Sequence, residues 1–199
     1  YDDRDVGKLF QSKQFEKTHE NTATLRHNTE EIINELYKPK KAVFEKQIQF
    51  TDKDLENLSA SDPKNPYKNR WYIKSQKCFS MFYSIFKSNE IKKEFEKDFK
   101  YDAVIRMRFD MSIDKEFDMG KFDQKKMHAM RHTHNSYSFQ DTFAFSSSKN
   151  MDHYCSVFNK IDEYYSDGID FCPEILLGWH LKNGGFDIEK IRYSFKIVR

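Results

Sequence analysis

Residues 101–110 read YDAVIRMRFD, and this stretch decides the fold of the chain. Successive side chains of a strand point to opposite faces, and the residues here alternate in that way. One face carries Ala103, Ile105, Met107 and Phe109, which are all apolar. The other face carries Asp102, Val104, Arg106, Arg108 and Asp110. The stretch is therefore predicted to be a strand of an α/β domain, with the active centre at its charged face.

Two arginines on one face of this strand need anionic partners, because burying an unpaired charge is costly. At the carboxyl end of a strand in an open α/β sheet, the partner is often a ligand. The planar fork of arginine suits a diphosphate, so Arg106 and Arg108 are candidates to bind one. Asp110 lies two residues after Arg108, at a position where its carboxylate could hold a metal ion or a ribose hydroxyl. The alternative is that both arginines pair with acids of neighbouring helices on a half-exposed strand.

Around this strand, hydrophobic spacing and capping residues predict alternating helices and strands. Helices are expected at 28–37, 71–86, 88–99, 150–165 and 173–183. Strands are expected at 42–48, 128–131, 142–146 and 193–198, and a long loop at 51–69. Strands that alternate with helices favour an α/β fold with a mostly parallel sheet flanked by helices.

Composition limits the function classes. The 199 residues suit one domain. The 34 basic residues nearly balance the 32 acidic ones, and a net charge of +2 argues against a dedicated nucleic-acid-binding or membrane-surface protein. No run of about 18 apolar residues could span a membrane, and the charged N-terminus is no signal peptide. With three widely spaced Cys residues interpreted as reduced thiols, the sequence predicts a cytoplasmic protein.

Two acids elsewhere in the chain are further candidates. Asp141 directly precedes an apolar strand, where an acid can act as a catalytic base, bind a sugar hydroxyl or simply form a turn. Glu174 follows Pro173 in the first turn of a helix, where a carboxylate commonly complements the helix dipole. A substrate role for either acid needs support from outside these local patterns.

Other chemistries find less support. His128, His132 and His134 suggest a zinc site, but structural zinc sites use four ligands, and no acid or Cys lies nearby in sequence. The chain contains no P-loop, no G-x-G-x-x-G, no G-x-S-x-G and no H-E-x-x-H motif. The common ATPase, dinucleotide oxidoreductase, serine hydrolase and zinc peptidase classes are thereby excluded.

The order of the motifs resembles a known set of proteins. A helix containing Ser75 and Gln76 leads to YDAVIRMRFD, then to QDTFAFSSSKNMDHY, then to PEILLGWHL. This order is similar to that of glycosyltransferase-like proteins of bacteria, phages and large viruses, akin to the WavE-type proteins of lipopolysaccharide and capsular polysaccharide synthesis. The resemblance covers about residues 29–199. It implies a GT-A-like, Rossmann-like fold over 1–199 as a single domain. It also implies that the family's first strand is missing, as the start at Tyr1 in a polar stretch suggests.

Residue roles follow from that resemblance. Arg106, Arg108 and Asp110 match an R-x-R-x-D strand in the place of the D-x-D metal motif. Arg108 stands where the D-x-D motif has its first acid, and a single carboxylate binds a divalent ion poorly. The site could therefore use a Mn²⁺ or Mg²⁺ ion or work without a metal. Asp141 matches the acid before a D-x-F-x-F strand, and Glu174 matches the P-E acid. The helix that begins with Ser75 and Gln76 is implied to face the donor.

The function expected on these grounds is that of a glycosyltransferase. A nucleotide-diphospho-sugar is the donor, and a glycan or lipid-linked hydroxyl is the acceptor. Arg106 and Arg108 would stabilise the departing diphosphate, Asp110 would hold ribose or a metal, and Asp141 would be the base. The alternative is a non-catalytic relative that binds nucleotide or sugar. A nucleic-acid-associated protein is a third hypothesis, disfavoured because Lys and Glu alternate along 90–100 as on a solvated helix face.

Overall fold

The computed structural model describes residues 29–46, 48–50, 75–113, 116–131, 138–169, 172–192 and 195–197. The chain divides into two compact units, Tyr1–Gln49 and Phe50–Arg199. No helix in these described ranges is both long and apolar enough to cross a membrane.

The described part of the first unit contains one helix, α3 (Thr29–Tyr37). Glu30 and Glu31 lie in its first turn, where acids complement the helix dipole, and the helix ends before Pro39. This helix confirms the prediction. The strand expected at 42–48 is wrong, because the residues described there form no strand and Val43 and Phe44 are exposed.

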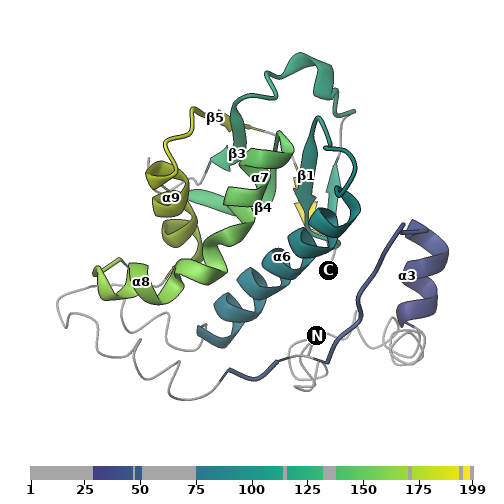
Figure 1. Ribbon diagram of the computed structural model, residues 1–199, viewed down its shortest axis with the longest axis horizontal. Coiled ribbons are helices and arrows are strands. Elements are labelled where there is room, and N and C mark those ends of the chain that lie inside the picture. The colour runs from purple at the N-terminus through teal and green to yellow at the C-terminus, as the bar shows by residue number, and fades with distance from the viewer. Residues whose placement is uncertain are drawn as a thin grey trace, which may run out of the picture. The chain divides into compact units, whose positions relative to one another are not determined.

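The second unit is built on a four-stranded sheet with the order β1-β4-β3-β5. The strands are β1 (Val104–Met107), β3 (Met127–Arg131), β4 (Phe139–Ser146) and β5 (Ile188–Ile191). β4 runs antiparallel to both β1 and β3, and only β3 and β5 are parallel (Figure 1). The expected mostly parallel, Rossmann-like (GT-A-like) sheet is therefore wrong. A parallel neighbour needs a crossover of about a dozen or more residues, and only seven residues separate the end of β3 at Arg131 from the start of β4 at Phe139.

A second, two-stranded sheet joins β2 (Met111–Ile113) to β6 (Phe195–Ile197) in antiparallel fashion. The strand predicted at 101–110 is therefore too long: β1 ends at Met107, a turn follows at Phe109 and Asp110, and the chain enters the other sheet. The strand predicted at 193–198 is confirmed by β6.

The helices of this unit differ in detail from the prediction. They are α6 (Ser75–Phe95), α7 (Ser148–Tyr154), the 3-10 helix η3 (Cys155–Lys160), α8 (Ile161–Ser166) and α9 (Pro173–Asn183). Two helices were predicted around Ser88, but α6 is continuous. The hydroxyls of Ser84 and Ser88 each donate to the carbonyl four residues earlier, so Ser88 lies inside the helix and does not cap a new one.

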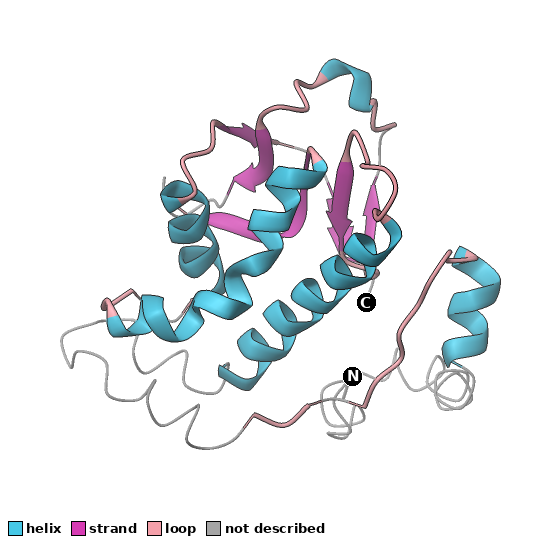
Figure 2. Cartoon of the chain, in the orientation of Figure 1, coloured by secondary structure: helices cyan, strands magenta, loops and turns pink. Residues whose placement is uncertain are grey.

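The helices lie on one face of the four-stranded sheet (Figure 2). Their apolar side chains and those of the sheet form a helix-side cluster that includes Cys78, Phe82, Ala144, Tyr154 and Leu176. On the other face a smaller, opposite cluster contains Met111, Met130, Phe143, Phe145 and Ile191. Next to this opposite cluster lie Phe117 and Phe122, which flank the 3-10 helix η2 (Met119–Lys121). The unit therefore has a helical layer on one side of the sheet and a thinner cover on the other.

Candidate functional site

Arg108 and Asp110, two of the predicted site residues, are paired with each other. Arg108 Nε lies 2.8 Å from Asp110 Oδ1 and Nη2 lies 2.5 Å from Oδ2, which is the bidentate geometry that strengthens such pairs. The turn after β1 brings the carboxylate back to the guanidinium. The partner of Arg108 is thus an acid two residues further along the same chain.

This pairing bears on the expected metal ion. Both oxygens of Asp110 are engaged by Arg108. Across the part of the chain that the structure describes, no group of three or more His, Cys, Asp or Glu side chains is arranged to hold a metal. Mn²⁺ and Mg²⁺ sites usually need several oxygen ligands. The described residues therefore do not fit a resident divalent ion.

Arg106 has a different environment from Arg108. It lies opposite Ala144 in the β1–β4 register, and Ala144 belongs to the helix-side cluster. Its Nη1 atom is buried and forms no hydrogen bond with any described residue. A buried donor without a partner costs roughly 1–3 kcal/mol, more when it is charged. The Nη1 atom is therefore a buried donor that no described residue satisfies.

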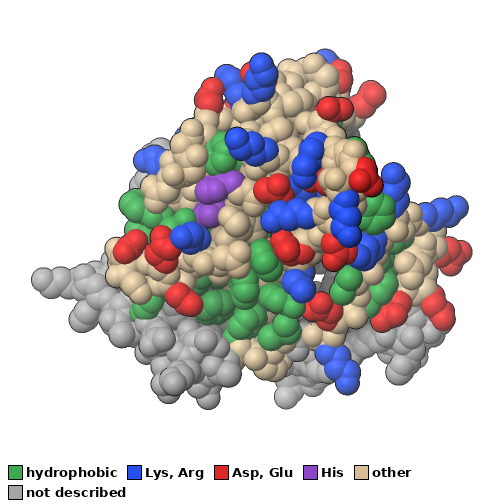
Figure 3. Space-filling view, viewed as in Figure 1, with side chains coloured by type: hydrophobic (Ala, Val, Ile, Leu, Met, Phe, Trp, Pro, Cys, Tyr) green, Lys and Arg blue, Asp and Glu red, His purple; other side chains and the backbone are tan. Residues whose placement is uncertain are grey.

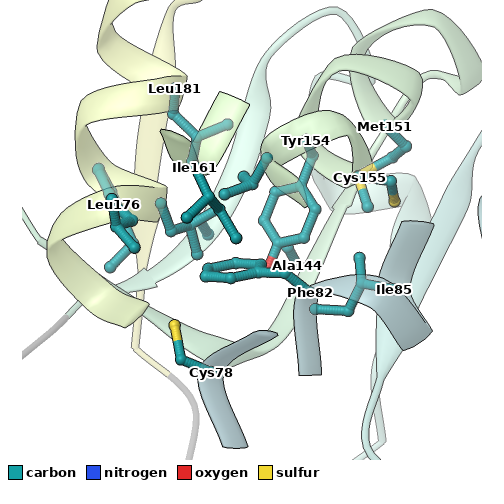
Figure 4. Close-up of a cluster of buried hydrophobic side chains, with 14 of the residues drawn as sticks. Cys78, Phe82, Ile85, Ala144, Met151, Tyr154, Cys155, Ile161, Leu176 and Leu181 are labelled. Atoms are coloured by element: carbon teal, nitrogen blue, oxygen red, sulfur yellow. The ribbon is translucent and has the colours of Figure 1, made fainter. Parts of the chain in front are cut away.

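Tyr154 is a second buried polar group without a partner in the described ranges. Its side chain is 1% exposed, and its hydroxyl forms no hydrogen bond there. The ring lies beside Phe82, with Ala144 close by (Figure 4). Burial raises the pKa of the phenol, the charge of Arg106 opposes that rise, and Asp141 adds to it. Both charges therefore act at the Tyr154 hydroxyl.

A distortion of β4 explains how Asp141 reaches the helical side. The β3–β4 register shifts between Ala129 and Arg131. Phe139 belongs to the helix-side cluster, whereas Phe143 belongs to the opposite cluster, although an even number of residues separates them. A regular strand would place both on one face, so the bulge reverses the alternation. Asp141 lies within this reversed segment.

Glu174 approaches the same region from α9. It accepts a hydrogen bond from the thiol of Cys172, with Sγ 3.0 Å from Oε2. Burial, reinforced by this hydrogen bond, raises the pKa of Cys172 to about 12. Burial also raises the pKa of Cys78 on α6, and the nearby Cys172, Asp141 and Glu174 add to that rise. Residues from α6, β4 and α9 thus share one electrostatic environment.

We call Arg106, Asp141, Tyr154, Glu174 and Cys78 the half-buried polar site, in which Tyr154 and Cys78 are buried and the three charged residues are partly exposed. It contains three of the predicted residues, from segments far apart in sequence. Ser75 and Gln76 form the first turn of α6, less than one turn before Cys78, and their side chains lie outside the described residues. Arg108 and Asp110 form a separate pair at the end of β1.

No local pattern in the sequence singled out Tyr154 or Cys78. Both lie on apolar helical stripes, and the structure places both in the helix-side cluster. A buried Tyr needs a partner for its hydroxyl, and this requirement is the signal that could have pointed to Tyr154.

The histidines considered for a zinc site are not brought together by the described residues. His128 is fully buried, stacks on Phe145 and bonds through Nε2 to the Asp123 carbonyl. His132 and His134 lie outside the described residues.

Comparison of the chain with models of protein families, with curated proteins and with solved structures gave no match in any of the three. The charge of the surface is mixed: acidic and basic side chains alternate over the face in Figure 3. A protein that binds nucleic acid through its phosphates usually presents a one-sided basic surface.

Proposed function

We propose that this protein is a glycosyltransferase that moves a sugar from a nucleotide-diphospho-sugar to a hydroxyl of a glycan or lipid-linked acceptor. The observation that carries the proposal is the buried Nη1 of Arg106, which has no partner among the described residues. A diphosphate oxygen would supply the missing acceptor and neutralise the charge.

In this mechanism, the bond between the anomeric carbon and the diphosphate oxygen breaks, and Arg106 stabilises the negative charge left on the diphosphate. The acceptor oxygen forms the new bond to the anomeric carbon and loses its proton to Asp141. Asp141 suits this role because its charge acts on Tyr154, the same hydroxyl on which the charge of Arg106 acts. Glu174 then contacts a hydroxyl of the sugar or of the acceptor.

A second candidate function is a non-catalytic module that binds a nucleotide diphosphate or its sugar. One observation favours it: two of the three candidate carboxylates already have partners within the chain. Asp110 is paired with Arg108, and Glu174 accepts from Cys172. Asp141 would then be the only candidate base among the predicted residues.

Thermal unfolding with a panel of nucleotide diphosphates and nucleotide sugars tests both functions. A ligand that binds the folded state raises the melting temperature by mass action. We expect one nucleotide diphosphate to give a shift that is lost in Arg106→Met and kept in the control Arg131→Met, since Arg131 is exposed on β3. The absence of any such shift would refute both candidates.

A measurement of turnover distinguishes the glycosyltransferase from the binding module. Donor hydrolysis and transfer are measured for the wild type and for Asp141→Asn. We expect the variant to keep the ligand-induced shift and to lose turnover by at least about 100-fold, which is typical for a general base. Binding without turnover in the wild type would instead identify a binding module. Unchanged turnover in Asp141→Asn would remove Asp141 from the mechanism.

A further inference from the structure

Cys172 and Glu174 form a thiol–carboxylate contact at the start of α9. The Cys172 thiol donates to Oε2 of Glu174, at an Sγ–Oε2 distance of 3.0 Å. Between the two residues lies Pro173, the first residue of the helix, whose ring fixes its backbone angle φ. The contact therefore belongs to a turn with little backbone freedom.

The backbone that carries the thiol is held by the helix. The Cys172 carbonyl accepts from the N–H groups of Ile175, at 3.0 Å, and of Leu176, at 2.8 Å. Leu176 is fully buried in the helix-side cluster, so this end of α9 is attached to the core. A donor on a fixed backbone can hold a flexible side chain in one place.

The two oxygens of the Glu174 carboxylate differ. Oε2 is bound by the thiol, whereas Oε1 forms no hydrogen bond with any described residue. The side chain is partly exposed, and ordering a long Glu side chain costs conformational entropy. A bond that orders it before the substrate arrives removes that cost from binding. One oxygen is thus fixed, and the other can accept from a substrate hydroxyl.

The thiol suits this task because it keeps its proton. Burial, reinforced by the bond to Glu174, raises the pKa of Cys172 to about 12. A thiol with so high a pKa remains a hydrogen-bond donor at neutral pH. The negative charge therefore stays on the carboxylate.

Electrostatics at Cys78 show which region Glu174 faces. Burial raises the pKa of the Cys78 thiol on α6, and the charge of Cys172 adds to that rise. The carboxylates of Asp141 on β4 and of Glu174 on α9 raise it further. Because both carboxylates act at one thiol, the contact between Cys172 and Glu174 lies in the same region as the proposed base.

We propose that Cys172 is a positioning residue of the half-buried polar site. Its thiol holds Oε2 of Glu174, and Oε1 then accepts a hydrogen bond from a hydroxyl of the sugar or of the acceptor. This role rests on the proposed transferase function, in which Glu174 makes that contact. The thiol takes part in no covalent step.

Kinetics with a conservative variant test the positioning. Glu174→Ala first identifies the substrate whose KM depends on the carboxylate. For that substrate we expect Cys172→Ala to raise KM by roughly 3- to 10-fold with kcat nearly unchanged, as the loss of one hydrogen bond implies. Cys172→Ser keeps a donor and should return KM to within about 2-fold of the wild type. Equal KM values in Cys172→Ser and Cys172→Ala would overturn the proposal.

A double variant separates positioning from packing. If the thiol acts through Glu174, adding Cys172→Ala to Glu174→Ala should change KM no further. A further rise in KM in the double variant would overturn the positioning role. Cys155→Ala is the matched control, because it removes another buried thiol from the helix-side cluster. It should lower the melting temperature and leave KM unchanged.

Alkylation tests the contact without any substrate. The Glu174 carboxylate helps to raise the pKa of the Cys172 thiol. Iodoacetamide should therefore modify Cys172 at least about 3-fold faster in Glu174→Gln than in the wild type, as mass spectrometry measures. An unchanged rate would overturn the positioning role even if the wild type transfers sugar. Faster modification in a protein that transfers no sugar would leave the contact standing and refute the proposed function, and with it the substrate role of Glu174.

Discussion

His153 and His180 bind each other reciprocally. Their rings stack with centroids 4.0 Å apart and 6° between the planes. His153 Nε2 lies 2.9 Å from the His180 carbonyl, and His180 Nε2 lies 2.7 Å from the His153 carbonyl. A carbonyl only accepts, so each Nε2 carries the proton. The Tyr164 hydroxyl then donates to His180 Nδ1 at 2.7 Å, and the neutral His180 is fully satisfied.

This arrangement makes the stability of the protein sensitive to acid. Burial lowers the pKa of His180 from 6.5 to about 4. Between these values the unfolded chain binds a proton that the folded protein does not, so stability rises with pH there. We expect the contribution of His180 to be complete above pH 6.5 and to be lost as the pH falls towards 4. The loss is up to about 3 kcal/mol in the free energy of unfolding, which urea denaturation at stepped pH measures.

The matched variant is His180→Gln, which cannot take up a proton. It should be less stable than the wild type at pH 7, because the bond from Tyr164 is altered. It should also show a shallower dependence of stability on pH between 6.5 and 4. Identical pH slopes in the two proteins would exclude His180 as the titrating group.

Gly184 is predicted to be intolerant of a side chain. A Cβ there would lie 2.4 Å from His153 Nε2 and 2.4 Å from the ring of Phe186. Overpacking of this kind costs typically about 1–3 kcal/mol. We expect Gly184→Ala to lower the melting temperature and to weaken the pH dependence described above. Gly185→Ala is the comparison: it meets no atom within 4 Å, but its φ of +69° disfavours a side chain, so a smaller cost of about 1 kcal/mol is expected.

Glu96 is expected to be the main acid-sensitive carboxylate at the end of α6. Burial by itself would raise its pKa, but hydrogen bonds from Ser148, the Tyr101 N–H, Lys92 and Lys100 lower it to about 2. The stabilisation is therefore present above pH 4.5 and is lost as the pH falls towards 2. We expect Glu96→Gln to cost about 2–3 kcal/mol at pH 7 in chemical denaturation, because bonds to a buried charge are replaced.

The control for that variant is Glu90→Gln. Glu90 pairs with Lys93 on the exposed side of the same helix, at 3.0 Å. Exposed pairs of this type contribute about 0.3–0.5 kcal/mol, so the change should be small. Equal losses in the two variants would contradict the role assigned to burial.

Arg106 should be a residue whose removal does not harm the folded protein. Its buried Nη1 has no partner in the described part of the chain, so replacing it by an apolar side chain removes a desolvation cost. We expect Arg106→Met to raise the free energy of unfolding by about 1 kcal/mol while abolishing the binding of nucleotide diphosphate. A clear loss of stability in the ligand-free variant would show instead that Arg106 has a structural partner.

Several elements could be predicted from local signals. Glu30, Glu31 and Pro39 mark α3, and Pro173 with Gly184 marks α9, because helix ends depend on residues next to them in sequence. β3 and β4 follow from short apolar runs. The continuity of α6 could not be predicted, because Ser88 suits a helix start as well as a helix interior in which it bonds to Ser84.

The candidate site could be predicted only in part. Arg106, Asp141 and Glu174 are polar residues beside apolar runs, which made them visible in the sequence. Their charges affect the pKa values of the buried Tyr154 and Cys78, and this effect could not be predicted. It depends on the bulge in β4, which changes the face on which Asp141 lies. The pairing of Arg108 with Asp110 depends on a turn where an extended strand was expected.

The sequence by itself determined the positions of most helices and strands and the residue types of the site. These properties depend on neighbours in sequence and on side-chain chemistry. Only the tertiary structure decided that β4 runs antiparallel between β1 and β3, that Ile105 is exposed while Arg106 faces the helices, and that Arg108 binds Asp110. Strand order and burial depend on contacts between distant segments, whose free energies are not encoded in any one stretch of the chain.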